Sequence, residues 1–162
     1  MTYKYERKYP AQCPFLRACG LDRGEAWRLR VGDIIWRDGR LCVHIREYRS
    51  LDQVVLTEEH IAPVVPGQEQ AVLRLVEGRA PQEQVFSRPA LPVPTRHVMY
   101  SLRRHYAHAL YLSYDPQRKL PGPAKRKISS PRDYDEEAAR KVAAAMGRPN
   151  ADPKDLMRWY VL

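Results

Sequence analysis

The sequence predicts one α+β domain, mainly helical, with a small three-stranded antiparallel sheet on one side of the helices. Three observations point to this class. Apolar residues recur at helical spacing in several segments, an Asp-Gly pair at 38–39 is the strongest hairpin signal, and 162 residues suit one hydrophobic core. We expect a basic, aromatic N-terminal arm over residues 1–10 and the domain itself over 11–162.

The first part of the chain predicts an arm and two short helices. Residues 1–10 place tyrosines among basic residues, which is typical of a frayed terminus or of a segment that stacks on bases. A helix is expected over 11–19, because Gly20 follows it as a left-handed cap. A second helix begins at Asp22, where Glu25 three residues later completes a capping box.

Three strands are expected after these helices. Residues 33–36 and 41–45 are apolar or alternating and flank the Asp-Gly pair, so they predict a β-hairpin. Residues 46–59 are polar and ambiguous, and leave loop and strand both open. Residues 61–65 predict the third strand, and the prolines in and after it favour an edge of the sheet.

The remainder of the chain predicts helices separated by one long loop. Helices are expected over 68–76, over 95–112 and over 135–146, and a last helix begins at Asp152, which precedes a proline in a favoured capping arrangement. Residues 113–132 combine four prolines with basic residues and few apolar ones. This composition predicts an exposed loop, either simply solvated or in contact with phosphates.

The charge balance favours a nucleic-acid partner. The chain holds 28 Lys and Arg against 19 Asp and Glu, a net charge of +9, as is common where phosphates are neutralised. A merely basic protein is the alternative. No apolar run approaches the roughly 18–20 residues of a membrane span, and the first residues show no signal-peptide core, so we expect a cytoplasmic protein without a membrane partner.

Cysteines and histidines do not indicate a metal or cofactor. Cys13, Cys19 and Cys42 are odd in number and lack the CxxC spacing, so neither a disulfide framework nor a zinc site is expected. His105 and His108 stand three residues apart on an expected helix, but no carboxylate or cysteine has a matching offset. We therefore expect no metal and no cofactor.

Three segments, in this order, resemble the catalytic domain of the tyrosine recombinases, the phage-integrase family. Residues 19–25, Cys-Gly-Leu-Asp-Arg-Gly-Glu, resemble the family's Gly-Leu-Arg-x-x-Glu segment. Residues 100–107, Tyr-Ser-Leu-Arg-Arg-His-Tyr-Ala, resemble its His-x-x-Arg helix. Residues 142–148, which lead to Trp159-Tyr160-Val161, are similar to its Leu-Gly-His turn and tyrosine helix.

The resemblance implies a specific chemistry. A tyrosine attacks a DNA phosphodiester to form a 3′-phosphotyrosyl bond, without ATP or metal, and two arginines stabilise the negative charge of the transition state. On this chain it implies Tyr160 as the nucleophile and Arg103 as the second arginine. Family members also use an N-terminal domain that clamps the DNA, for which this chain has no room, so we expect either that a partner recombinase or further subunits supply it, or that catalysis has been abandoned.

Several catalytic positions depart from the family pattern. Asp22 stands where the first arginine is expected, with Arg23 one residue late, and Tyr100 and Arg148 replace the usual histidines or tryptophan. No lysine occurs in 46–59, where the family's catalytic lysine would lie. The candidate catalytic residues are Tyr160, Arg103, Arg148, Arg23 and Tyr100.

These departures predict a DNA-binding domain of a recombination or integration system, such as that of a mobile element, with impaired strand cleavage and duplex DNA as partner. The candidate DNA-contacting residues are Arg49, Arg104, Arg118, Lys119, Lys125, Arg126 and Lys127. The alternative is a non-enzymatic nucleic-acid-binding module, unrelated to recombinases, that uses residues 1–10 and 113–132. A structural or protein-interaction domain is the third class.

Overall fold

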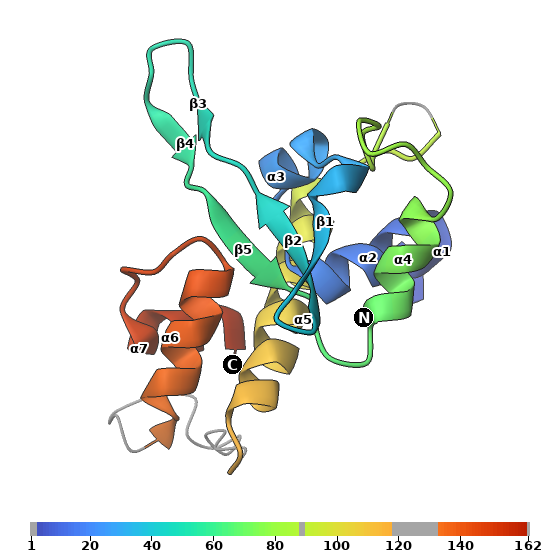
Figure 1. The fold of residues 1–162 in the computed structure, drawn as a ribbon. Coiled ribbons are helices and arrows are strands. Elements are labelled where there is room, and N and C mark those ends of the chain that lie inside the picture. The colour runs from blue at the N-terminus through green and yellow to red at the C-terminus, as the bar shows by residue number, and fades with distance from the viewer. Residues whose placement is uncertain (1–2, 88–89, 118–132, 162) are drawn as a thin grey trace.

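A three-stranded antiparallel sheet and a long helix form the centre of the fold (Figure 1). The computed structural model describes residues 3–87, 90–117 and 133–161. The strands lie in the order β1-β2-β5, with bounds Ile34–Arg37, Arg40–Ile45 and His60–Pro63. The mixed class, the small sheet and the edge position of the third strand are confirmed.

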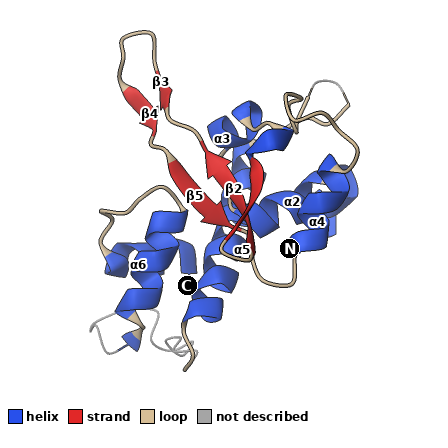
Figure 2. Ribbon diagram, in the orientation of Figure 1, coloured by secondary structure: helices blue, strands red, loops and turns tan. Residues whose placement is uncertain are grey.

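Helices make up most of the regular structure around this sheet (Figure 2). Their bounds are α1 Tyr3–Lys8, α2 Gln12–Cys19, α3 Arg23–Arg28, α4 Glu69–Val76, α5 Arg96–Tyr114, α6 Glu136–Ala145 and α7 Pro153–Leu156, with a 3-10 turn η1 at Val31–Asp33 and a π-helical turn η3 at Met157–Val161. The two halves of α5 belong to different apolar clusters. Its first half packs with α2, α4 and the sheet, and its second half packs with α6 and α7.

Gly20 allows α2 to approach α5 closely. Its φ is 67°, the left-handed conformation expected after this helix, and a Cβ atom there would lie 2.0 Å from Cδ1 of Tyr106. The Tyr106 hydroxyl in turn donates to the Pro63 carbonyl (2.9 Å), and burial holds its pKa well above the usual value. This contact ties α2, α5 and the edge strand together.

The ambiguous segment 46–59 forms two short strands that extend the antiparallel pair of β2 and β5. Strands β3 (Tyr48–Arg49) and β4 (Val55–Thr57) pair with each other in a second, two-stranded ladder. The alignment that pairs Ile45 with His60 also pairs Tyr48 with Thr57, so β2, β3, β4 and β5 form one long ribbon whose end projects from the molecule (Figure 1). We call residues 48–57 the β-arm.

The described part of the N-terminal arm, residues 3–10, is not frayed, in contrast to the frayed terminus expected over residues 1–10. Residues Tyr3–Lys8 form helix α1, and Tyr9 is buried in the main apolar cluster. Glu6 also forms an ion pair with Arg17 of α2. The expectation was wrong because tertiary packing and this ion pair, which local composition does not reveal, hold the segment.

Two predicted boundaries are also wrong. Helix α5 continues to Tyr114, and Asp115 is buried, so the exposed loop does not begin at residue 113. The basic residues predicted within that loop, from 118 onward, lie outside the described residues. The third strand ends at Pro63 rather than at residue 65, because the Val65 amide donates to the Ala18 carbonyl of α2 (3.0 Å).

Candidate functional site

The start of helix α3 places two carboxylates beside helix α5. The Asp22 side chain accepts a hydrogen bond from the Glu25 amide (2.8 Å), and the Glu25 side chain accepts one from the Asp22 amide (2.6 Å). The predicted capping box is therefore confirmed. It fixes both carboxylates at the helix N-terminus.

Arg103 is buried and held by three segments of the chain. Its Nη1 donates to Glu25 (3.2 Å), its Nη2 donates to the Met146 carbonyl at the end of α6 (2.7 Å), and the Asp22 carboxylate lies 3.8 Å away. The side chain is only 8% exposed, and its Nε has no hydrogen-bond partner in the described part of the chain. Both terminal nitrogens of Arg103 therefore donate to groups inside the protein.

His60 lies next to this buried pair. Its Nε2 is 4.0 Å from Glu25, and its Nδ1 donates to the Glu58 carbonyl (2.9 Å). Gly147, with φ of 69°, ends α6 against the ring, since a Cβ there would lie 2.6 Å from the imidazole. Sequence analysis missed His60 because no motif contains it and its partner Glu25 is 35 residues away.

A hollow of about 550 Å³ lies between α3, the β-arm, α5 and the C-terminal segment. We call it the arginine pocket. One carboxylate, Asp22, faces five arginines around it: Arg23, Arg28, Arg96, Arg103 and Arg148. Tyr100 and Tyr160 also line it, so the structure gathers all five candidate catalytic residues around one hollow.

The cations of the arginine pocket are largely unpaired. Within the described residues, its ion pairs all involve Arg103, whereas Arg23, Arg96 and Arg148 are exposed and have no carboxylate within ion-pair distance. Arginine keeps its charge at any physiological pH and donates in a planar fork that matches phosphate oxygens. The pocket is thus suited to an anion such as a phosphate diester.

Two tyrosines stand side by side within the pocket. The ring centroids of Tyr100 and Tyr160 are 5.9 Å apart, and the guanidinium carbon of Arg148 lies 5.3 Å from the Tyr160 ring centroid. Tyr160 is partly exposed and belongs to the π-helical turn η3, a conformation that occurs frequently at functional sites. Tyr160 therefore lies beside an exposed arginine of the pocket.

Arg104 lies in a neighbouring hollow rather than in the arginine pocket. That hollow, of about 410 Å³, is bordered by Ser101, Arg104, His105, His108, Tyr160 and Val161. The Nδ1 atoms of His105 and His108 each donate to a backbone carbonyl, at 2.7 and 2.8 Å. Tyr160 lines both hollows.

Sequence analysis did not identify Arg28 and Arg96. Arg28 donates to the Thr57 hydroxyl (2.7 Å), and its guanidinium lies 3.9 Å from the Tyr48 ring centroid, so it links α3 to the β-arm. Arg96 precedes Tyr100 by four residues, and Arg103 follows Tyr100 by three, which places them on one helix face. That spacing was a usable signal for Arg96, whereas Arg28 needed the folded structure.

Other predicted contact residues lie elsewhere. Arg49 is on the β-arm, where it donates to Glu47 (2.6 Å) and to the Gln53 carbonyl (3.2 Å), and it does not line the arginine pocket. The remaining candidates lie outside the described residues: Arg118, Lys119, Lys125, Arg126 and Lys127.

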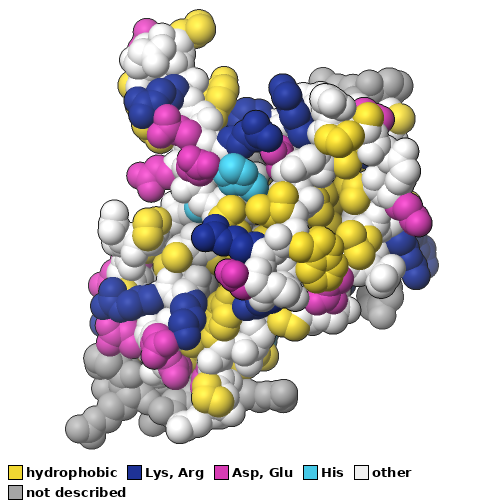
Figure 3. All heavy atoms as spheres, viewed as in Figure 1, with side chains coloured by type: hydrophobic (Ala, Val, Ile, Leu, Met, Phe, Trp, Pro, Cys, Tyr) yellow, Lys and Arg dark blue, Asp and Glu magenta, His cyan; other side chains and the backbone are white. Residues whose placement is uncertain are grey.

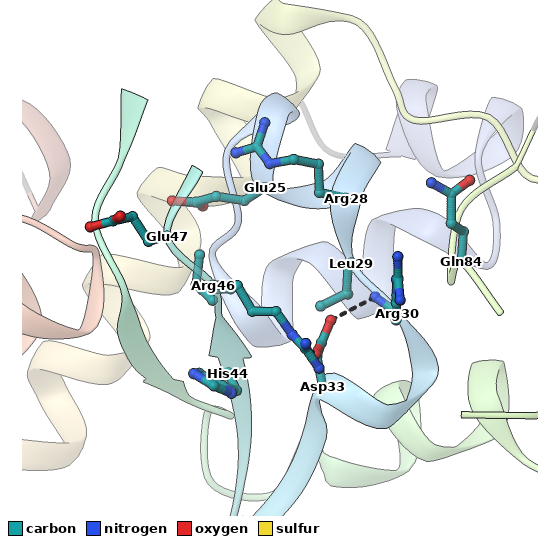
Figure 4. A pocket seen from close by; sticks show the side chains of 10 residues that line it. Glu25, Arg28, Leu29, Arg30, Asp33, His44, Arg46, Glu47 and Gln84 are labelled. Carbon is teal, nitrogen blue, oxygen red and sulfur yellow. Dashed lines mark hydrogen bonds and ion pairs between the residues drawn. The ribbon is translucent and has the colours of Figure 1, made fainter. Parts of the chain in front are cut away.

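A third hollow, shown in Figure 4, differs from the arginine pocket in its charge, because arginines and several carboxylates line it together. This mixed pocket of about 290 Å³ contains Arg28, Arg30 and Arg46 together with acidic residues. Asp33 accepts hydrogen bonds from the Arg46 side chain (2.7 Å) and the Arg30 amide (2.9 Å). Its three arginines therefore share the pocket with three carboxylates, Glu25, Asp33 and Glu47, and Arg46 forms an ion pair with Asp33.

The described residues offer no metal centre. They contain no group of three or more His, Cys, Asp or Glu placed to hold a metal ion. Cys13, Cys19 and Cys42 are buried free thiols, and burial raises their pKa values. None of the helices in the described ranges has the length and apolar character needed to cross a membrane.

Comparison of the chain with models of protein families, with curated proteins and with solved structures finds no match. The resemblance to tyrosine recombinases therefore remains a prediction from the three segments quoted above.

Proposed function

We propose that this protein binds duplex DNA as a tyrosine-recombinase-like domain whose strand-cleavage chemistry is impaired. The observation that carries the proposal is the convergence of five arginines from α3, α5 and the C-terminal segment on the hollow that Tyr160 lines. Gathering like charges costs free energy unless an anion neutralises them. A chain with net charge +9 and such a pocket fits the phosphate backbone of DNA.

The arrangement also suggests how a phosphate would be held. The exposed guanidinium groups of Arg23, Arg96 and Arg148 approach the pocket from different elements and can donate to separate oxygens of one or two phosphates. Tyr160 would then stand beside the phosphorus. In a cleavage step the Tyr160 phenol oxygen would bond to phosphorus, the bond from phosphorus to the 5′ oxygen of the next nucleotide would break, and the phenol proton would pass through solvent water to that 5′ oxygen.

Three features argue that this step is slow. Asp22 replaces the first arginine, and its carboxylate would repel the phosphate. Arg103 uses its donors on Glu25 and Met146 rather than presenting them to a ligand. Among the described residues that line the pocket there is no lysine to protonate the leaving oxygen. Removing one donor of this type typically slows a reaction about 10²–10³-fold.

The role we propose is therefore binding within a recombination or integration system, such as that of a mobile element, in support of a partner that supplies the complete chemistry. A non-enzymatic nucleic-acid-binding module would use the same pocket for phosphates, and the engagement of Arg103 inside the protein favours that alternative over an active enzyme.

Fluorescence anisotropy with a labelled duplex at several salt concentrations tests the proposal. A surface that neutralises about five phosphates should show a log–log dependence of affinity on salt with a slope of roughly −4 to −5. Absence of binding at about 50 mM salt, or binding that salt does not weaken, would contradict the proposal.

A suicide DNA substrate and denaturing electrophoresis test the impaired chemistry. We expect little or no covalent adduct, and a stronger adduct from the variant Asp22→Arg with Tyr100→His, because both changes add donors at the phosphate. Robust adduct formation by the unaltered chain, lost in Tyr160→Phe, would show that the chain is an active enzyme.

A further inference from the structure

The β-arm exposes most of the large apolar side chains found at the surface. Seven such side chains are exposed in the described part of the chain, and five of them belong to the arm: Tyr48 (41%), Leu51 (99%), Val54 (58%), Val55 (37%) and Leu56 (60%). Figure 3 shows hydrophobic side chains at the end of this projecting ribbon. Contiguous exposed apolar surface marks an interaction site.

The tip of the arm is an ordered turn. The Ser50 amide donates to the Val54 carbonyl (2.8 Å), and the Gln53 amide donates to the Ser50 carbonyl (3.0 Å). The Ser50 hydroxyl also accepts from the Val54 amide (3.2 Å). These hydrogen bonds close the turn, while the Leu51 side chain is exposed to solvent.

The base of the arm is fixed beside the arginine pocket. Arg28 donates to Thr57 and stacks on Tyr48, one residue on each strand of the arm. Leu56 and Thr57 themselves line the pocket. The cluster of cations therefore adjoins the base of the arm, and the apolar tip lies at the projecting end of the same ribbon (Figure 1).

The acidic residues at the root of the arm lie away from the arginine pocket. Glu58 and Glu59 line a different hollow, which they share with His60 and Lys141, and Glu59 pairs with His44 (2.6 Å). None of the arm residues in the arginine pocket is acidic. The turn itself holds one carboxylate, Asp52 beside Leu51, and the positive charge is supplied by the five arginines at the base of the arm.

We infer that the β-arm enters a groove of duplex DNA, with Leu51 as an apolar wedge between base pairs, while the arginine pocket holds the adjoining backbone. This inference rests on the proposed function. Apolar side chains that enter the minor groove unstack a base step and bend the duplex, which brings more phosphates against the protein. A flexible TA step is the easiest step to open.

A protein partner would also cover the apolar tip, but would leave the neighbouring arginines unexplained. The groove of a polyanion accounts for both features, because bases accept the apolar side chains and phosphates accept the guanidinium groups. We therefore favour DNA as the occupant.

The test uses a duplex of about 30 base pairs with 2-aminopurine at a central TA step, and with donor and acceptor dyes at its ends. We compare the unaltered chain with Leu51→Ser combined with Val54→Thr. The matched control is Trp36→Ser, which removes a side chain of 64% exposure on strand β1, outside the arm. Anisotropy on the same duplex reports binding.

The unaltered chain and the control should raise the 2-aminopurine fluorescence and bring the two dyes closer. The arm variant should do neither and should bind about tenfold more weakly, since burial of a leucine contributes a factor of that order. Its salt dependence should become shallower, because an unbent duplex brings fewer phosphates against the protein, but should persist because the arginines remain.

Two outcomes would overturn the inference. In the first, the unaltered chain binds the duplex with full salt dependence but leaves the 2-aminopurine fluorescence and the separation of the dyes unchanged. The arm is then not a wedge, although the proposed function holds. In the second, the arm variant binds DNA normally but loses self-association in sedimentation, which would assign the tip to a protein contact. Failure to bind DNA at all would overturn both proposals.

Discussion

The arginine pocket and the mixed pocket share Arg28, but their charges are balanced differently. The mixed pocket sets Arg28, Arg30 and Arg46 against three carboxylates, and buried Asp33 pairs with Arg46. The arginine pocket sets five arginines against one carboxylate. The number of arginines is therefore a poor guide to a binding site, and the number left without an internal partner is a better one.

The arginine pocket repeats this contrast on a smaller scale. Arg103 is buried against Glu25 and works as part of the structure, whereas Arg148 is exposed and lies over Tyr160. The family resemblance assigns both to phosphate. The geometry gives Arg103 a positioning role, since it joins the start of α3 to the end of α6.

Removal of Arg103 should have the largest effect on stability. Arg103→Met leaves the buried Glu25 carboxylate without its ion pair, which typically costs about 3–5 kcal/mol. Arg148→Met removes an exposed side chain and should change the free energy of unfolding by about 0.5 kcal/mol or less. Urea denaturation measures both values, and equal losses would mean that Arg103 is not the internal support described here.

Asp33→Asn should make the mixed pocket resemble the arginine pocket. It removes the charge that balances Arg46 and weakens two hydrogen bonds, so the free energy of unfolding should fall by about 1–3 kcal/mol. Affinity for duplex DNA should nevertheless rise, because a guanidinium becomes available. Thermal melting and anisotropy test the two effects separately. Unchanged DNA affinity in a folded variant would contradict the idea that an ion pair with a carboxylate keeps an arginine from binding DNA.

Asp22→Asn should make the arginine pocket more positively charged. Asparagine caps a helix as well as aspartate does, so the change in stability should stay within about 1 kcal/mol. Loss of the one carboxylate should strengthen DNA binding severalfold, which corresponds to roughly 1 kcal/mol at this separation. Weaker binding would indicate that Asp22 contacts DNA directly.

Tyr160→Phe should have the smallest effect. The ring and its contact with Arg148 remain, and only the hydroxyl is lost, so DNA affinity should change less than twofold, or about 0.4 kcal/mol. Anisotropy at moderate salt measures this value. A large loss of affinity would show that the hydroxyl holds the phosphate in the ground state.

Local signals explain which parts of the fold could be predicted. The capping box at Asp22, the left-handed Gly20 and the hairpin at 38–39 each depend on residues a few positions apart, and all are present in the structure. The β-arm was ambiguous because its apolar residues are not buried, so its strands lack the usual alternation. Helix α1 was missed because Tyr9 is held by tertiary packing.

The site was predictable only in part, because local sequence signals do not reveal partners that are distant in sequence. The three segments of the resemblance indicated Arg103, Arg148 and Tyr160, which the structure brings to one hollow. The partners that decide their roles are distant in sequence, because Glu25 precedes Arg103 by 78 residues. Sequence patterns therefore identified candidate residues but not which arginines are free.

The most direct test of the account compares two double variants that lower the net charge equally. Arg23→Gln with Arg148→Gln removes two unpaired cations from the arginine pocket, and Arg30→Gln with Arg46→Gln removes two cations from the mixed pocket, of which Arg46 pairs with Asp33. Anisotropy against salt should show a loss of about two phosphate contacts, and thus a slope shallower by roughly 2, in the first variant alone. Equal losses in both folded variants would show that overall charge, and not the arginine pocket, binds DNA.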